Sequence, residues 1–138
     1  MEAFEIMRKT KSFAIIGASA KEESYGFKLV KNLKDVGYTV FPINPKYPEI
    51  YGLRTYKSVT DIKEIPDNIV LAMSAVNNIK VLSSLQNFKC SFIWLPPECW
   101  NDELVNKASE MKLKILKDKC PIGTFLKLKV LSNNKETE

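Results

Sequence analysis

The residues best placed for chemistry lie in a glycine-containing loop, Gly17 to Gly26, that follows a short apolar run. This run, Phe13 to Ile16, is too short for a core helix, and its end at a glycine is typical of a strand buried on both faces of a parallel sheet. After the loop, apolar residues recur at helical spacing until Gly37, which suits the left-handed end of a helix. A loop that leads from a strand into a helix N-terminus presents backbone N–H groups and a positive dipole end to an anion. The pattern therefore predicts a phosphate-binding loop.

Several kinds of chemistry are excluded by residue types. The chain has no histidine, which removes the usual general base and the Ser-His and Cys-His nucleophile pairs. Its three cysteines, Cys90, Cys99 and Cys120, form no CxxC pair, so we expect free thiols and no metal site. The Walker pattern GxxxxGK[ST] is absent, which disfavours ATP hydrolysis. Among the 21 Lys and Arg residues only Arg8 and Arg54 are arginine, and the lysines are scattered, which disfavours nucleic-acid binding.

The second predicted strand, Thr39 to Asn44, narrows the choice of nucleotide. A dinucleotide fingerprint reads GxGxxG, but Ser19 and Glu22 occupy its second and third glycine positions. The strand ends in Asn44-Pro45-Lys46, where a nucleotide with a free ribose would require Asp or Glu. A lysine at this point favours a phosphate on the ribose instead. An NAD-type oxidoreductase is therefore a disfavoured alternative.

Strand and helix patterns alternate along the rest of the chain. Further strands are expected at 53–56, 68–74, 91–95 and 113–117, and helices at 1–9, 59–64, 76–88 and 101–111. Alternation with short loops predicts an α/β protein with a Rossmann-like three-layer α/β/α fold and a mainly parallel sheet of five or six strands. We expect one domain over residues 1–132 and a disordered tail over 133–138, and the pattern leaves 122–132 open between edge strand and helix.

In such a sheet, ligands bind beyond the carboxyl ends of the strands, near the point where strand order reverses. Four segments are predicted to converge there: 17–26, 44–47, 74–77 and 95–98. Simpler roles exist for some of these residues. Gly17 and Gly26 suit a tight turn, Ser74 suits a helix N-cap, and the aromatic rings of Tyr25 and Tyr47 suit either adenine stacking or a core edge.

No apolar run approaches the roughly 18 residues of a membrane helix. The first nine residues interleave charged and apolar side chains, which is typical of an amphipathic helix and not of a signal peptide. We expect a cytoplasmic protein that binds neither membranes nor nucleic acid.

An ordered set of motifs resembles the small CoA-binding protein family and the CoA-binding N-terminal domain of acyl-CoA synthetases and succinyl-CoA ligase. The resemblance covers about residues 10–121. Its motifs are Gly17-Ala18-Ser19 with Gly26 nine residues after Gly17, Gly37-Tyr38, Asn44-Pro45-Lys46, Gly52 before a Tyr-Lys-Ser segment, and Asp118 to Pro121.

The resemblance implies that the chain holds coenzyme A or an acyl-CoA, with the glycine loop at the pyrophosphate and Lys46 near the adenosine phosphates. No catalytic residue is expected. The candidate cofactor-binding residues are Gly17, Ala18, Ser19, Tyr25, Gly26, Asn44, Pro45, Lys46 and Ser74. This chain departs from the family at Pro96-Pro97, where many small members carry a Trp-Leu-Gln-Leu-Gly-type loop.

Two functions remain open at this point. The first is a CoA-binding protein without catalytic activity of its own, such as a carrier or sensor, alone or as a homodimer. The alternative is a non-catalytic CoA-binding subunit of a multi-chain acyl-CoA ligase or transferase, whose phosphate-carrying histidine lies in a separate chain. Cys120 lies at the same expected edge, where thiol exchange with CoA and an inert buried cysteine are both open.

Overall fold

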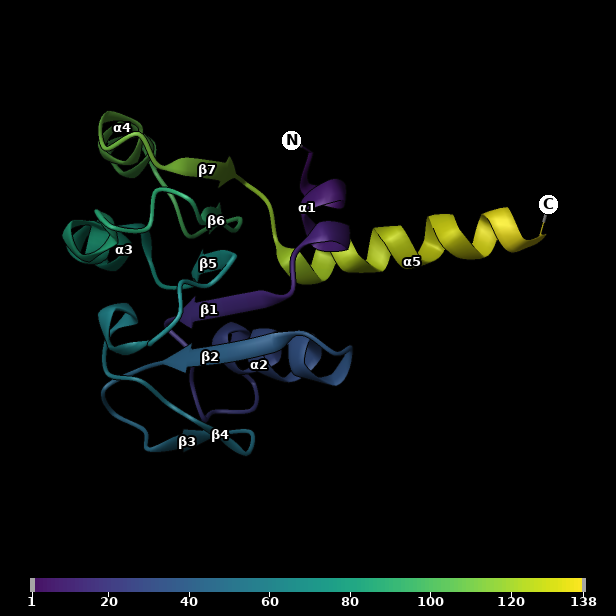
Figure 1. Cartoon of the computed structure of the whole chain (residues 1–138), viewed down its shortest axis with the longest axis horizontal. Helices are drawn as coiled ribbons and strands as arrows, with labels where there is room; N and C mark the ends of the chain where they lie inside the picture. Colours follow the sequence, from purple (N-terminus) through teal and green to yellow (C-terminus); the bar gives the residue numbers. More distant parts are fainter. Residues whose placement is uncertain (1, 138) are drawn as a thin grey trace.

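The computed structural model describes the backbone of residues 2–137 and the side chains of residues 2–129. Five parallel strands form one sheet in the order β2-β1-β5-β6-β7, from bottom to top in Figure 1. Their bounds are β1 (Ser12–Ile16), β2 (Thr39–Ile43), β5 (Asn68–Leu71), β6 (Phe92–Leu95) and β7 (Lys114–Lys117). The predicted Rossmann-like fold is confirmed.

Helices cover both faces of the sheet. One face carries α1 (Ala3–Lys9), α2 (Tyr25–Asp35) and α5 (Pro121–Thr137). The other carries α3 (Ala75–Val81), α4 (Asp102–Glu110) and two short 3₁₀ helices, η1 (Val59–Asp61) and η2 (Leu82–Leu85). The helices therefore form the two outer layers of the predicted sandwich.

Each strand of the sheet contributes to two hydrophobic cores. In β1, Phe13 and Ile15 pack with the layer of α1 and α2, whereas Ala14 and Ile16 pack with the layer of α3 and α4. The same alternation places Trp94, which is fully buried, in the first of these cores. Successive side chains of a strand point to opposite faces, so a strand covered on both sides must be apolar throughout.

The segment after β2 differs from the expected strand at 53–56. Residues Glu49–Ile50 (β3) and Leu53–Arg54 (β4) form a separate antiparallel hairpin, and only Tyr56 bridges the main sheet, next to Ile43. The N–H of Tyr56 donates to the carbonyl of Pro42, at 2.9 Å. Because that carbonyl faces the outer edge of β2, the missing N–H of the proline costs no hydrogen bond within the sheet. Strand β2 therefore tolerates its proline at the edge of the main sheet.

The C-terminal segment that the sequence left open is helical. Its helix, α5, starts at Pro121, a residue suited to the first helical position, and packs Ile122, Phe125 and Leu128 against the α1 and α2 layer. The helix runs to Thr137 and so includes most of the predicted disordered tail.

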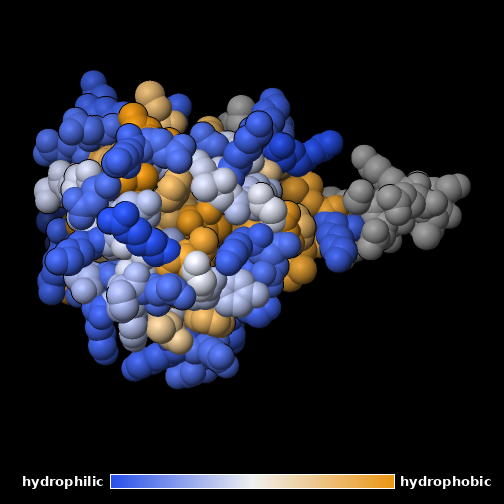
Figure 2. Space-filling view, turned by 60° about the horizontal axis from the view of Figure 1, so that its bottom comes forward, coloured by the Kyte–Doolittle hydropathy of each residue, from blue (hydrophilic) through white to orange (hydrophobic). Residues whose placement is uncertain are grey.

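The surface in Figure 2 is largely hydrophilic, with apolar side chains gathered in the middle of this face and at the base of α5. Over the described residues, none of the helices has the length and apolar character needed to cross a lipid bilayer.

Candidate functional site

The strand order reverses next to β1. From β1 the chain moves outward to the edge strand β2 and then returns to β5 on the other side of β1. The loops that follow β1 and β5 therefore leave the sheet in opposite directions, and a crevice opens between them at the carboxyl edge. This is the place where the sequence predicts the binding site.

Close backbone contact explains the two glycines of the loop. Gly17 has φ +97°, and a Cβ atom there would lie 2.6 Å from Cγ of Met73. A Cβ atom on Gly26 would lie 2.2 Å from the carbonyl oxygen of Gly17. The start of α2 thus rests directly on the end of β1, a spacing that requires glycine at position 26, whereas Gly17 is required by its positive φ and by the close approach of Met73.

Only some of the N–H groups at the N-terminus of α2 are capped. The hydroxyl of Ser24 accepts the N–H of Phe27 at 3.2 Å, whereas the N–H groups of Tyr25 and Gly26 donate to no acceptor within the described part of the chain. Such N–H groups together with the helix dipole attract an anion. Ser19, which lies on the same loop, uses its hydroxyl to accept the N–H of Lys21 at 3.1 Å.

Asn44 joins two loops of the site. Its side-chain amide donates to the carbonyl of Ala18 at 2.8 Å, and its side-chain oxygen accepts the N–H of Lys46 at 2.8 Å. Ala18 is fully buried. The predicted residues Ala18 and Asn44 are therefore brought together, and Asn44 sets the shape of the turn that carries Pro45 and Lys46.

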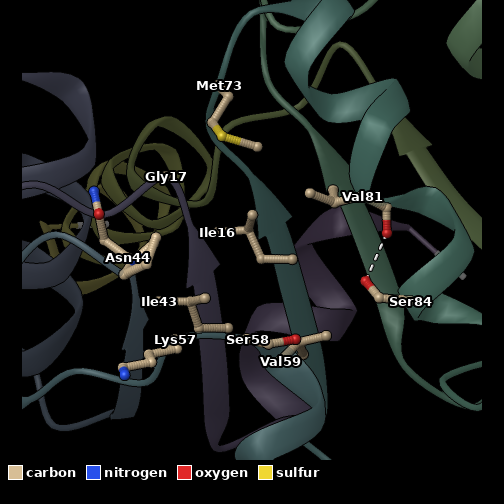
Figure 3. Close-up of a pocket in the computed structure, with 11 residues that line it drawn as sticks. Ile16, Gly17, Ile43, Asn44, Lys57, Ser58, Val59, Met73, Val81 and Ser84 are labelled. Atoms are coloured by element: carbon tan, nitrogen blue, oxygen red, sulfur yellow. Dashed lines mark hydrogen bonds between the residues drawn. The ribbon is translucent and has the colours of Figure 1, made fainter.

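A cavity of about 300 Å³ opens beside these loops, and Figure 3 shows its lining. Its walls are mostly apolar, with Asn44 and Lys57 on one side and Met73 across from them. The lining residues are Ile16, Gly17, Ile43, Asn44, Pro45, Lys57, Ser58, Val59, Met73, Val81 and Ser84. The structure thus brings Gly17, Asn44 and Pro45 together in one cavity.

Lys46 is not among the residues that line this cavity. Its ammonium lies 5.6 Å from the centre of the Tyr47 ring, on an exposed turn. Lys57 is the cation in the cavity wall, and our interpretation of the sequence missed it as a candidate. The bridge between Ile43 and Tyr56 places Lys57 at the carboxyl edge. The Tyr-Lys-Ser segment at 56–58 was the sequence feature that could have indicated Lys57 as a candidate.

A second hollow, of about 510 Å³, lies on the other side of Met73, which lines both. It contains the predicted residues Tyr25 and Ser74. Ser74 also caps α3, because its hydroxyl accepts the N–H of Asn77 at 3.4 Å. The lining residues are Tyr25, Ala72, Met73, Ser74, Pro97, Glu98, Cys99 and Cys120.

Burial favours the neutral forms of two groups in the second hollow, the phenol of Tyr25 and the thiol of Cys99. The hydroxyl of Tyr25 donates to Sγ of Cys120 at 2.9 Å, and burial, followed by this bond, raises the pKa of Tyr25 well above its usual range. Burial also raises the pKa of Cys99, with smaller contributions from Cys120 and Glu98. Among the described residues, no group of three or more His, Cys, Asp or Glu side chains is placed to hold a metal ion.

Comparisons with known proteins identify the family of this chain. The family model described as "CoA binding domain" matches residues 11–124. The acetate–CoA ligase [ADP-forming] of Methanocaldococcus jannaschii is 50% identical over 76 residues, which are 55% of this chain and 10% of the ligase. The chain therefore spans about a tenth of the length of that relative.

Two other similar proteins match over most of both chains. An uncharacterized protein of Bacillus subtilis, YneT, is 25% identical over 122 residues, covering 86% of this chain and 88% of its own. The structure of a hypothetical protein from Pyrococcus horikoshii OT3 aligns with a TM-score of 0.84 and 29% identity, covering 91% of this chain and 89% of that one.

Proposed function

Because the chain belongs to the CoA-binding domain family, we propose that it binds coenzyme A along the carboxyl edge of the sheet and has no catalytic activity of its own. The observation that carries the proposal is the pair of hollows that share Met73, with the N-terminus of α2 beside them. An anion-binding helix end beside two hollows matches the chemistry of CoA, whose pyrophosphate joins the adenosine to the uncharged pantetheine arm.

The proposal assigns each part of CoA to a part of the edge. The pyrophosphate lies at the N–H groups of Tyr25 and Gly26, on the loop that also carries Ala18 and Ser19. The adenosine lies in the cavity lined by Asn44 and Pro45, and the arm crosses Met73 toward Ser74 in the second hollow.

Two lysines are available for the ribose phosphate of the adenosine. We assign this phosphate to Lys46, which lies on the exposed turn that directly follows Asn44 and Pro45 of the cavity lining. Lys57, in the cavity wall, contributes positive charge to the nucleotide as a whole. Both ammonium groups act as point charges and need no bidentate geometry.

Titration calorimetry with CoA, dephospho-CoA and NAD tests this function. We expect CoA to bind most tightly, and the Lys46→Ala variant to lose about tenfold in affinity for CoA but not for dephospho-CoA, since one charge-assisted contact is removed. Lys57→Ala is expected to weaken the binding of CoA and of dephospho-CoA alike. Lys89 is exposed and lies away from both hollows, so Lys89→Ala is expected to change the binding of neither. Equal weak binding of all three ligands would overturn the proposal.

A second candidate is supported by the identity to the ligase segment. In this function the chain is a CoA-binding subunit of an acyl-CoA ligase or transferase whose other chain supplies the histidine and the nucleotide site. Affinity purification from the native cell is the test: a copurifying ligase chain and restored acyl-CoA formation support it, and CoA binding with no such partner favours the first candidate.

A further inference from the structure

Two cysteine thiols and one phenol from distant parts of the chain line the second hollow. Cys99 follows β6, Cys120 follows β7, and Tyr25 begins α2. Tyr25 and Cys120 are 95 positions apart, yet the hydroxyl of Tyr25 donates to the sulfur of Cys120 at 2.9 Å. The proposed pyrophosphate site does not use this cluster of groups.

The two loops that carry the thiols are fastened together. The indole N–H of Trp100 donates to the Asp118 carboxylate at 3.1 Å, and the N–H of Lys119 donates to the carbonyl of Leu95 at 3.3 Å. The ammonium of Lys117 lies 4.6 Å from the centre of the Trp100 ring. These contacts hold the loop of Cys99 beside the loop of Cys120, so the second hollow is a built pocket with fixed walls.

Among the three cysteines, Cys120 is the one best placed to meet a ligand in the second hollow. It directly precedes Pro121, the first residue of α5. The Tyr25 hydroxyl donates a hydrogen bond to its sulfur. Cys120 is partly accessible from the hollow, whereas Cys99 is buried and Cys90 is exposed outside it.

We propose that Cys120 is a site of thiol–disulfide exchange that takes the disulfide of CoA and keeps one CoA as a mixed disulfide in the second hollow. This inference rests on the proposed CoA binding, because the route from the α2 N-terminus past Met73 leads the arm of CoA, which ends in sulfur, toward Cys120.

The exchange balances without a further oxidant. The Cys120 thiol first gives up its proton to solvent, and the thiolate attacks one sulfur of the CoA disulfide. A bond forms between Sγ of Cys120 and that sulfur, the disulfide bond of the ligand breaks, and the second CoA leaves as a thiolate that takes up a proton. Cys120 is oxidised, and the departing CoA sulfur is reduced.

The test compares the three cysteines in one chain. The reduced protein is incubated with CoA disulfide or with glutathione disulfide, quenched by acid at intervals, and mapped by peptide mass spectrometry. We expect CoA on Cys120 at least tenfold faster than on Cys90, and glutathione to show no such preference for Cys120. Exposure alone predicts the reverse order, so CoA appearing first on Cys90 would overturn the proposal.

Two further arms separate site-directed exchange from chance reaction. Desulfo-CoA, which has no thiol, is expected to slow exchange at Cys120 and leave Cys90 unchanged. At saturating CoA disulfide, Tyr25→Phe is expected to slow exchange at Cys120 about tenfold, because the hydrogen bond to the attacking sulfur is lost while the ring remains. An unaltered rate at Cys120 in this variant would remove the assigned role of the hydroxyl.

The outcome also distinguishes this inference from the proposed function. If calorimetry detects CoA binding but Cys120 exchanges no faster than Cys90, the exchange site is wrong and CoA binding stands. If calorimetry detects no CoA binding and desulfo-CoA does not slow the exchange, both are wrong.

Discussion

The side-chain amide of Asn44 donates a hydrogen bond of 2.8 Å to the carbonyl of Ala18, which fastens the loop after β2 to the loop after β1. Ala18 is fully buried, so its carbonyl has no access to bulk water as a substitute donor. The same asparagine closes the turn of Lys46 through its side-chain oxygen. One residue therefore couples the glycine loop after β1 to the turn that carries the proposed ribose-phosphate lysine.

Replacing Asn44 should separate these two contacts. Asn44→Ala removes both and is expected to lower the free energy of unfolding by about 2 kcal/mol, since a buried carbonyl loses its donor. Asn44→Asp keeps the acceptor for the Lys46 N–H but loses the donor to Ala18. Urea denaturation measures both, and equal stability of Asn44→Ala and the native protein would contradict the coupling.

A methyl group at position 26 has no room. Gly26→Ala would place its Cβ atom 2.2 Å from the carbonyl oxygen of Gly17, and we expect a loss of about 1–3 kcal/mol in stability together with loss of CoA binding. Gly123→Ala, within α5, is the matched control, because its Cβ atom would lie 3.8 Å from Cβ of Cys120, which is an ordinary van der Waals contact. In this helix, Gly123→Ala should raise the free energy of unfolding by about 0.5–1 kcal/mol. Thermal denaturation that ranks the two variants in the opposite order would contradict the packing.

Asn78 holds the carboxyl end of β5 to the Cys99 loop. It is fully buried, and its amide donates to the carbonyls of Leu71 at 3.1 Å, Met73 at 2.8 Å and Cys99 at 2.8 Å. Asn78→Ala is expected to lower the free energy of unfolding by about 3 kcal/mol, since the three carbonyls lose the donor that they share. The neighbouring Asn77→Ala, at an exposed position, should stay within about 0.5 kcal/mol of the native protein. Chemical denaturation of both variants measures the difference.

Alkaline pH should weaken the fold. Burial raises the pKa of Cys99 and of Tyr25 in the folded state, so the unfolded chain loses these protons first as pH rises. Stability is fully present below the ordinary thiol and phenol pKa values and falls as pH rises above about 8.5 for the thiol and about 10 for the phenol. Unfolding by urea at a series of pH values from 7 upward measures the slope.

The matched variant for this pH dependence is Tyr25→Phe. It removes the phenol and should flatten the decline above the ordinary tyrosine pKa, while leaving the earlier decline from Cys99 in place. A stability that is constant through both ranges would show that burial does not hold these groups in their neutral forms.

The regular elements of the sheet were predictable because their signals are local. Strands β1, β5 and β6 are apolar on both faces, and the caps Ser58, Ser74 and Asn101 mark helix starts that the structure confirms. The strand expected at 53–56 is present only at Leu53–Arg54, where it pairs with β3 in a hairpin and not with the main sheet. A segment this short has the same residue pattern in a hairpin as in a larger sheet, so only the backbone pairing distinguishes the two positions.

The site was predictable at its glycines and at Asn44, but not at Lys57. Glycine spacing reports a backbone requirement that exists within one loop, whereas Lys57 reaches the cavity through a single bridge between Tyr56 and Ile43. The roles of Lys46 and Ser74 as ligand contacts stay predictions. The structure adds that Ser74 caps α3 and that Lys46 lies outside the cavity wall.

The sequence by itself determined the order of strands and helices, the glycine loop between β1 and α2 and the absence of histidine from these 138 residues, because periodicity, glycine spacing and residue inventory are properties of the chain. Only the tertiary structure decided that α5 packs beside α1 and that Tyr25 meets Cys120. It also decided that Met73 separates two hollows at one edge of the sheet. These contacts join residues far apart in the chain, and the free energy of packing that selects them leaves no local pattern in the sequence.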